Sequence, residues 1–154
     1  MPGDARVLAP GSGDFPLSDR LAHVVRDAAR ALTRDLTARL ASQGVSFGHW
    51  AFLRILWEKD GLTQRELSDQ AGVMEPTTAA ALKAMEELGY VARRQLPENR
   101  KNVYVHLTPK GRALRARLEP MAVAVNKAAV RGVDPSDVAA CRRVLLGILG
   151  NLKA

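Results

Sequence analysis

The positively charged side chains of this 154-residue chain are concentrated in one segment. Residues 93–117 hold eight basic residues against the single acid Glu98, an excess as large as the net charge of +7 of the whole chain. Lysine and arginine gathered in one segment create a directed positive field that attracts a polyanion. A solvated basic face is the alternative, but the concentration of charge favours a phosphate-bearing partner. The basic residues are Arg93, Arg94, Arg100, Lys101, Lys110, Arg112, Arg115 and Arg117.

A second set of candidate contacts lies on a helix predicted between Pro76 and Gly89. Its free N-terminal N–H groups attract phosphate, and its outer face carries small side chains that let the backbone approach a ligand. Thr and Ala methyl groups can pack against thymine, and a Thr hydroxyl can bond either kind of base edge. The pattern predicts a helix that fits the major groove, with specificity resting partly on DNA shape. The alternative is a core helix whose outer face is merely small. The candidate residues are Pro76, Thr77, Ala80 and Lys83.

Residues that serve catalysis or metal binding do not form a constellation in this sequence. His23, His49 and His106 lack the spacing of metal ligands, and no Cys or carboxylate cluster joins them. The chain has neither a Gly-rich phosphate loop nor a nucleophile elbow, so we expect no enzyme, cofactor or metal. The one cysteine, Cys141, excludes an internal disulfide. It falls on an apolar helical stripe, which predicts a buried and inert thiol.

Short helices and a tight turn must position the predicted DNA contacts. Apolar residues recur every three or four positions over residues 21–40, which predicts a first helix. Ser46 is the predicted N-cap of a second helix, and Thr63 opens a third with a capping-box pattern. The third helix closes at Gly72, and the helix over residues 76–88 follows it directly. A short helix, a glycine-containing turn and a second helix predict a helix-turn-helix.

The apolar period then changes to two, which predicts two half-buried strands joined by a polar tip at residues 94–102. A basic hairpin directly after a helix-turn-helix is a wing. Arg100, at its tip, suits insertion into a narrow minor groove. A flexible, solvated loop is the alternative for this tip. The predicted phosphate contacts are Arg93, Arg94 and Lys101 and, at the start of the third helix, Thr63 and Gln64.

The two ends of the chain complete the predicted organisation. Thr108-Pro109 and Asp134-Pro135 predict the starts of two further helices, and Pro120 should kink the first of them. Residues 1–18 predict a flexible lead-in without the apolar core of a signal peptide. No apolar run approaches the ~20 residues that a membrane span needs. The sequence therefore predicts one domain and a cytoplasmic location.

The stretch LTQRELSDQAGVMEPTTAAALKAMEELGYVARR, followed by NRKNVYVHLTPKG, resembles the MarR (multiple antibiotic resistance regulator) family. The resemblance spans residues 20–150 and is strongest over residues 46–111. It implies a mainly α (α+β) fold, in which a winged helix-turn-helix lobe (46–107) is flanked by dimerisation helices (19–45 and 108–154). It also implies a homodimer that binds double-stranded DNA at a palindromic operator. The expected role is a repressor, less often an activator, that a small aromatic acid-like effector releases.

The resemblance also assigns residues to the DNA contact. Thr77, Thr78, Ala80 and Lys83 fall on the recognition helix, and Arg100 falls on the wing arginine. Two positions depart from the family pattern. Asn99 stands where Asp is common, which predicts weaker, neutral bonds and a mobile wing without DNA. Ala80 stands where many relatives carry a long polar residue, which predicts unusual base readout.

In similar proteins the effector pocket lies between the dimer helices and the DNA-binding lobe. An aromatic wall, an imidazole and a guanidinium would suit an aromatic carboxylate. The candidates are His23, His49, Trp50, Leu53 and Arg54. The alternatives are that Trp50 packs on Val45 as a hydrophobic staple and that His49 is an exposed first-turn residue. A further rival is a dimerisation or adaptor module that has lost DNA binding, and the intact basic wing argues against it.

Overall fold

A computed structural model describes residues 20–153, over which the chain forms seven α-helices and three β-strands. The predicted lead-in, residues 1–18, lies outside this range. The helices are α1 (Leu21–Ala41), α2 (Phe47–Glu58), α3 (Gln64–Ala71), α4 (Glu75–Glu87), α5 (Pro109–Ala113), α6 (Arg115–Ala129) and α7 (Pro135–Asn151). The strands are β1 (Leu62–Thr63), β2 (Val91–Leu96) and β3 (Asn99–Leu107). None of the described helices is both long and apolar enough to cross a membrane.

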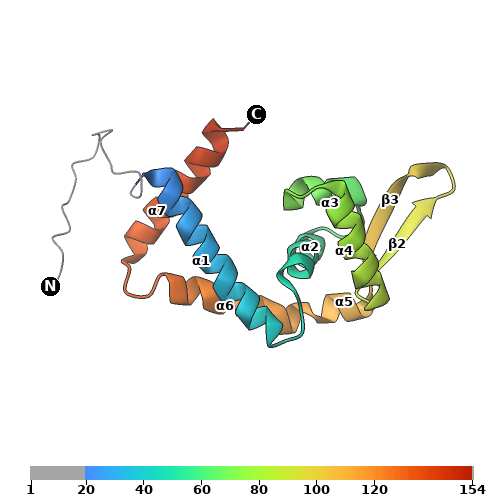
Figure 1. Cartoon of the computed structure of the whole chain (residues 1–154), viewed down its shortest axis with the longest axis horizontal. Helices are drawn as coiled ribbons and strands as arrows, with labels where there is room; N and C mark the ends of the chain where they lie inside the picture. Colours follow the sequence, from blue (N-terminus) through green and yellow to red (C-terminus); the bar gives the residue numbers. More distant parts are fainter. Residues whose placement is uncertain (1–19, 154) are drawn as a thin grey trace.

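The elements form two groups (Figure 1). Helices α2 to α5 and the three strands gather into a winged lobe, residues 47–113, and α1, α6 and α7 form a helical arm. Helix α1 packs across α6, and α5 leads directly into α6, so that the short α5 connects the lobe to the arm. A mainly helical fold with a small antiparallel sheet confirms the predicted winged helix-turn-helix class.

Four helices begin at the N-caps that the sequence predicted. Ser46 Oγ accepts the His49 N–H at 3.2 Å, and Thr63 Oγ1 accepts the Glu66 N–H at 3.1 Å. The Thr63 hydroxyl also lies 2.9 Å from the Glu66 carboxylate, which completes a local variant of the capping box. The caps of α5 and α7 are Thr108 and Asp134, each followed by proline at the first helical position.

The helix-turn-helix is held by a left-handed glycine and a buried polar contact. Gly72 closes α3 with a φ of 68°, a conformation that glycine adopts without steric cost. Behind the turn, the hydroxyls of Ser68 and Thr78 form a 2.7 Å hydrogen bond. The exposed fractions of these two residues are 2% and 0%, so the bond lies inside the contact between α3 and α4.

The three strands form one antiparallel sheet in the order β1-β3-β2. Leu62 pairs with Val105 in the short β1, whereas β2 and β3 pair from Val91 and Leu107 out to Leu96 and Asn99. The wing, β2 and β3 with their turn, is therefore longer than predicted. Most of the polar tip expected over 94–102 is strand, because backbone pairing continues where the side chains no longer alternate between apolar and polar.

The C-terminal end of α4 is fastened to the start of α5. The Thr108 N–H donates to the Tyr90 carbonyl at 3.0 Å, and Lys110 Nζ donates to the Leu88 carbonyl at 3.0 Å. Gly111 packs so closely here that a Cβ added to it would lie 2.1 Å from the Tyr90 carbonyl oxygen. The end of α4 and the beginning of the connection to α6 are therefore joined by direct hydrogen bonds and close packing.

The helical arm leaves much apolar surface exposed in the part of the chain that the structure describes. No residue of α7 is buried, and Leu149 and Leu152 are 64% and 78% exposed. Cys141 is exposed as well, so the prediction of a buried thiol is wrong for the single chain. Cys141 lies on the apolar stripe of α7, and within residues 20–153 no element buries that stripe. Helix α6 is continuous through Pro120, and a break at Leu114 divides the predicted helix into α5 and α6.

Candidate nucleic-acid interface

The N-terminal half of α4 exposes one face to solvent. Pro76, Thr77, Ala80 and Lys83 are exposed, whereas Leu82 and Met85 on the opposite face are fully buried. The helix is thus amphipathic with an outer face of mostly small side chains, as predicted. Thr78 does not belong to this face. It is fully buried against Ser68, so it has no surface to offer a base, and the prediction that it contacts DNA is wrong.

The tip of the wing carries exposed cations on a hydrogen-bonded frame. Arg94, Arg100 and Lys101 are exposed. Asn99 Oδ1 accepts the Lys101 N–H at 3.3 Å, and Gln95 Nε2 donates to the Arg100 carbonyl at 3.1 Å. The bond to Asn99 involves no charged group, as expected from Asn at this position. Within residues 20–153 Arg100 forms no ion pair, so its guanidinium is free to bind a partner.

Arg93 is engaged with the recognition helix. Its N–H donates to Glu86 Oε2 at 3.1 Å, and its guanidinium lies 3.4 Å from Glu86 Oε1. The hydrogen bonds and charge of Arg93 hold the pKa of the Glu86 carboxyl below its usual value. Arg93 was predicted to contact phosphate, but in this structure it ties β2 to α4.

The start of α3, the start of α4 and the wing line a common concavity of about 370 Å³. It brings together the predicted contacts Thr63, Gln64 and Lys101. The Thr63 hydroxyl is occupied by its own helix cap, whereas Gln64 Oε1 is buried without a hydrogen-bond partner among the described residues. Four other residues line the concavity that were not predicted from the sequence: Arg65, Glu75, Asn102 and Val103. Arg65 follows Gln64 directly in the sequence. Because Gln64 was predicted to contact phosphate, the positive charge of its neighbour could have identified Arg65 as a further candidate.

Comparison with known proteins identifies this arrangement. A model of the MarR family matches residues 45–103. The solved structure of the transcriptional regulator PA3341 is 36% identical with a TM-score of 0.77, over 86% of this chain and 98% of that one. The chain belongs to the MarR family.

Two other proteins are similar to this MarR-family chain, one in sequence and one in fold. The HTH-type transcriptional regulator TtmR of Methylorubrum extorquens (strain PA1) is 29% identical over 115 residues, which cover 73% of this chain and 59% of TtmR. CouR of Rhodococcus jostii RHA1, solved with p-coumaroyl-CoA bound, shares the fold with a TM-score of 0.78 and 20% identity over 90% of this chain and 98% of CouR. The MarR-family chain is therefore a DNA-binding transcription regulator and not an enzyme. Within residues 20–153, no group of three or more His, Cys, Asp or Glu is arranged to hold a metal ion.

Four of the five residues predicted to bind an effector lie within two turns of α2, and His23 lies apart on α1. Trp50 and Leu53 are 6% and 0% exposed and belong to the core, so the prediction that they line a pocket is wrong. Trp50 instead packs edge-on against Trp57, with ring centroids 5.6 Å apart. His49 is half-buried, and burial lowers its pKa. The exposed Arg54 follows on the same helix, whereas the exposed His23 lies near the far end of α1, a helix about 30 Å long.

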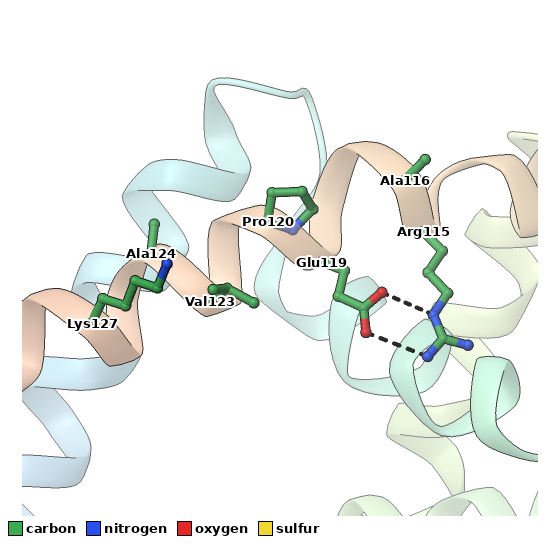
Figure 2. Close-up of a pocket in the computed structure, with 7 residues that line it drawn as sticks. All are labelled: Arg115, Ala116, Glu119, Pro120, Val123, Ala124 and Lys127. Carbon is green, nitrogen blue, oxygen red and sulfur yellow. Dashed lines mark hydrogen bonds and ion pairs between the residues drawn. The ribbon is translucent and has the colours of Figure 1, made fainter. Parts of the chain in front are cut away.

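A further concavity, of about 560 Å³, lies along α6 alone (Figure 2). Its lining residues are Arg115, Ala116, Glu119, Pro120, Val123, Ala124 and Lys127. At one end Arg115 forms an ion pair with Glu119 at 3.0 Å, which holds the pKa of that carboxyl below its usual value. The opposite face of α6 buries Leu118 and Val125. Because the concavity is lined by one helix, only another element can close it.

Proposed function

We propose that two copies of this chain form a dimer that binds a palindromic operator. Each copy would insert the outer face of α4 into the major groove while Arg100 of the wing enters the adjacent minor groove. The observation that carries the proposal is the common concavity at the starts of α3 and α4, to which Lys101 of the wing contributes. A phosphate there would lie between the two groove contacts, where a helix N-terminus and a lysine both favour an anion. Glu75 lines the same concavity and opposes an anion, so Lys101 must outweigh it.

The dimer would be formed by the helical arm. Helix α7 buries none of its residues, and Leu21 and Val24 of α1 are 58% and 49% exposed. Apolar surface of this extent on a single chain favours association. The concavity along α6 belongs to the same arm and is lined by that helix alone, with Val123 46% exposed. In the dimer, the second copy would close it. A C2 dimer would place its two recognition helices about 34 Å apart, the spacing of successive major grooves.

The regulator would act as a repressor that a small aromatic acid or its thioester releases. The ligand of CouR, p-coumaroyl-CoA, supports this class of effector for a chain of the same fold. His49 and Arg54 remain accessible, so they stay proposed contacts for the carboxylate or thioester. His23 is also accessible, but in a single chain it lies too far from them to share one small ligand, and only the dimer could bring it close.

The test combines light scattering with a gel-shift titration against the DNA upstream of the chain's own gene. We expect a dimer that shifts this DNA, and a shift that one member of a panel of aromatic acids and acyl thioesters reverses. A dimer that shifts neither this DNA nor any duplex selected from a random pool would favour the adaptor function. A stable monomer would contradict the operator geometry.

A further inference from the structure

Met74 is the most exposed large apolar side chain of the winged lobe, with 75% of its surface in solvent. It occupies the N-cap position of α4 and forms no cap hydrogen bond. This position favours Ser, Thr, Asp or Asn, and Ser46, Thr63 and Thr108 supply such a cap to α2, α3 and α5. Neither helix stability nor core packing accounts for a methionine here.

The surroundings of Met74 are apolar but flanked by negative charge. Val73, 38% exposed, precedes it, and the exposed Thr77 lies one turn into α4. Together they line a concavity of about 490 Å³ at the turn between α3 and α4. Asp69 lines the same concavity, Glu75 follows Met74 directly, and Lys101 lines only the other concavity, so a phosphate beside Met74 is disfavoured. If this turn contacts DNA, it therefore contacts base edges and not the backbone.

We propose that Met74 reads thymine, by packing its side chain against the 5-methyl group of that base in the major groove. The inference rests on the proposed function, in which the start of α4 enters this groove. The thymine methyl is the apolar feature that distinguishes base edges there. An unbranched, polarisable side chain adapts its shape to such a group, and Val73 with the Thr77 methyl would exclude water around it. The operator would then carry a thymine under each copy of Met74.

Replacement of thymine by deoxyuridine tests this contact, because it removes the methyl group and nothing else. Duplexes selected from a random pool by the wild-type protein are resynthesised with single thymines replaced in both half-sites. At the one thymine of each half-site that contacts Met74, the replacement should lower the affinity of the wild type roughly fourfold for each methyl removed. This is the factor expected for the burial of one methyl-sized group. Met74→Ser removes the apolar contact and supplies a capping hydroxyl, so it should fold normally and bind both duplexes equally.

Lys101→Ala is the matched control, because loss of a wing cation should weaken both duplexes by the same factor and leave their ratio unchanged. Equal binding of thymine and deoxyuridine duplexes by the wild type at every position would overturn the inference while leaving the proposed function intact. Retention of the wild-type ratio by Met74→Ser would overturn it as well. If the wild type selects no DNA at all, the proposed function fails and the inference fails with it.

Discussion

The carboxylate of Glu86 accepts both the backbone N–H and the guanidinium of Arg93, and so joins the recognition helix to the first strand of the wing. Strand β2 is an edge strand of the sheet, and this N–H would otherwise face solvent. Helix α4 and the wing, the two elements proposed to contact DNA, are thereby joined by a side-chain bridge in the chain without DNA.

Glu86→Gln should loosen this joint. We expect faster hydrogen exchange at the Arg93 amide and a loss of about 0.5 kcal/mol or less in the free energy of unfolding, since the pair is partly exposed. The folded-state pKa of Glu86 is lowered, so its contribution is present above the unfolded pKa and is lost as the pH falls through the folded value. The stability difference between wild type and variant should therefore vanish in acid. Glu87→Gln is the control, because it removes the same charge from a residue that forms no ion pair within residues 20–153. An equal change in hydrogen exchange at the Arg93 amide in both variants would contradict a specific role of Glu86.

Gly111→Ala should unfold the lobe more readily. The new Cβ would lie 2.1 Å from the Tyr90 carbonyl oxygen, which is backbone and cannot move aside without displacing the end of α4. Overpacking of this kind costs about 1–3 kcal/mol or more, measurable as a lower midpoint in urea. Gly48→Ala, in the first turn of α2, meets only ordinary contacts and should leave the midpoint unchanged or raised. Similar losses at both glycines would speak against the close approach.

The buried hydroxyl pair in the helix-turn-helix predicts a measurable coupling. Thr78→Val and Ser68→Ala should each cost about 1 kcal/mol in the free energy of unfolding, because each removes the 2.7 Å bond. The remaining hydroxyl keeps its bond to a helix carbonyl, Ser68 to Gln64 at 3.1 Å and Thr78 to Met74 at 3.4 Å. The double variant should cost less than the sum of the two, since the shared bond can be lost only once. Strict additivity in a denaturation cycle would mean that the bond contributes nothing.

Arg100→Ala should weaken operator binding and flatten its salt dependence. Each lost phosphate contact removes about 0.9 from the slope of log affinity against log salt. Arg131→Ala removes an exposed arginine from the loop between α6 and α7, far along the chain from the wing, and should leave the slope as it is. Lower affinity with an unchanged slope for Arg100→Ala would contradict a phosphate contact and leave only the proposed contact with the minor groove.

Leu149→Glu should dissociate the proposed dimer. The side chain is 64% exposed on α7, so the single chain tolerates a charge there, whereas an apolar interface does not. Light scattering should report a monomer whose circular dichroism is unchanged. Gln70→Glu adds the same charge at an exposed position of α3 and should remain dimeric. A dimeric Leu149→Glu would place the interface away from the C-terminal half of α7.

What could be predicted from the sequence was local or periodic. Ser46, Thr63, Thr108 and Asp134 were assigned as caps because a cap depends on a few neighbouring residues. The ion pair between Arg93 and Glu86 was missed, because it depends on how the wing packs on α4, which no local pattern encodes.

Two further errors have the same origin. Periodicity placed Cys141 on an apolar face, but it does not say whether the chain itself covers that face. Residue type suggested a ligand pocket for Trp50 and Leu53, but aromatic and aliphatic residues near a helix start serve a core equally well.

Strand β1 supports only the base of the wing. It pairs with β3 at Tyr104 and Val105, so beyond these residues β3 has β2 as its sole neighbour in the described sheet. A ribbon of two strands bends far more easily than a sheet of three. The base of the wing is therefore held by three strands, whereas its outer end is free to bend. In the proposed complex with DNA, this bending would let Arg100 follow minor grooves of different width.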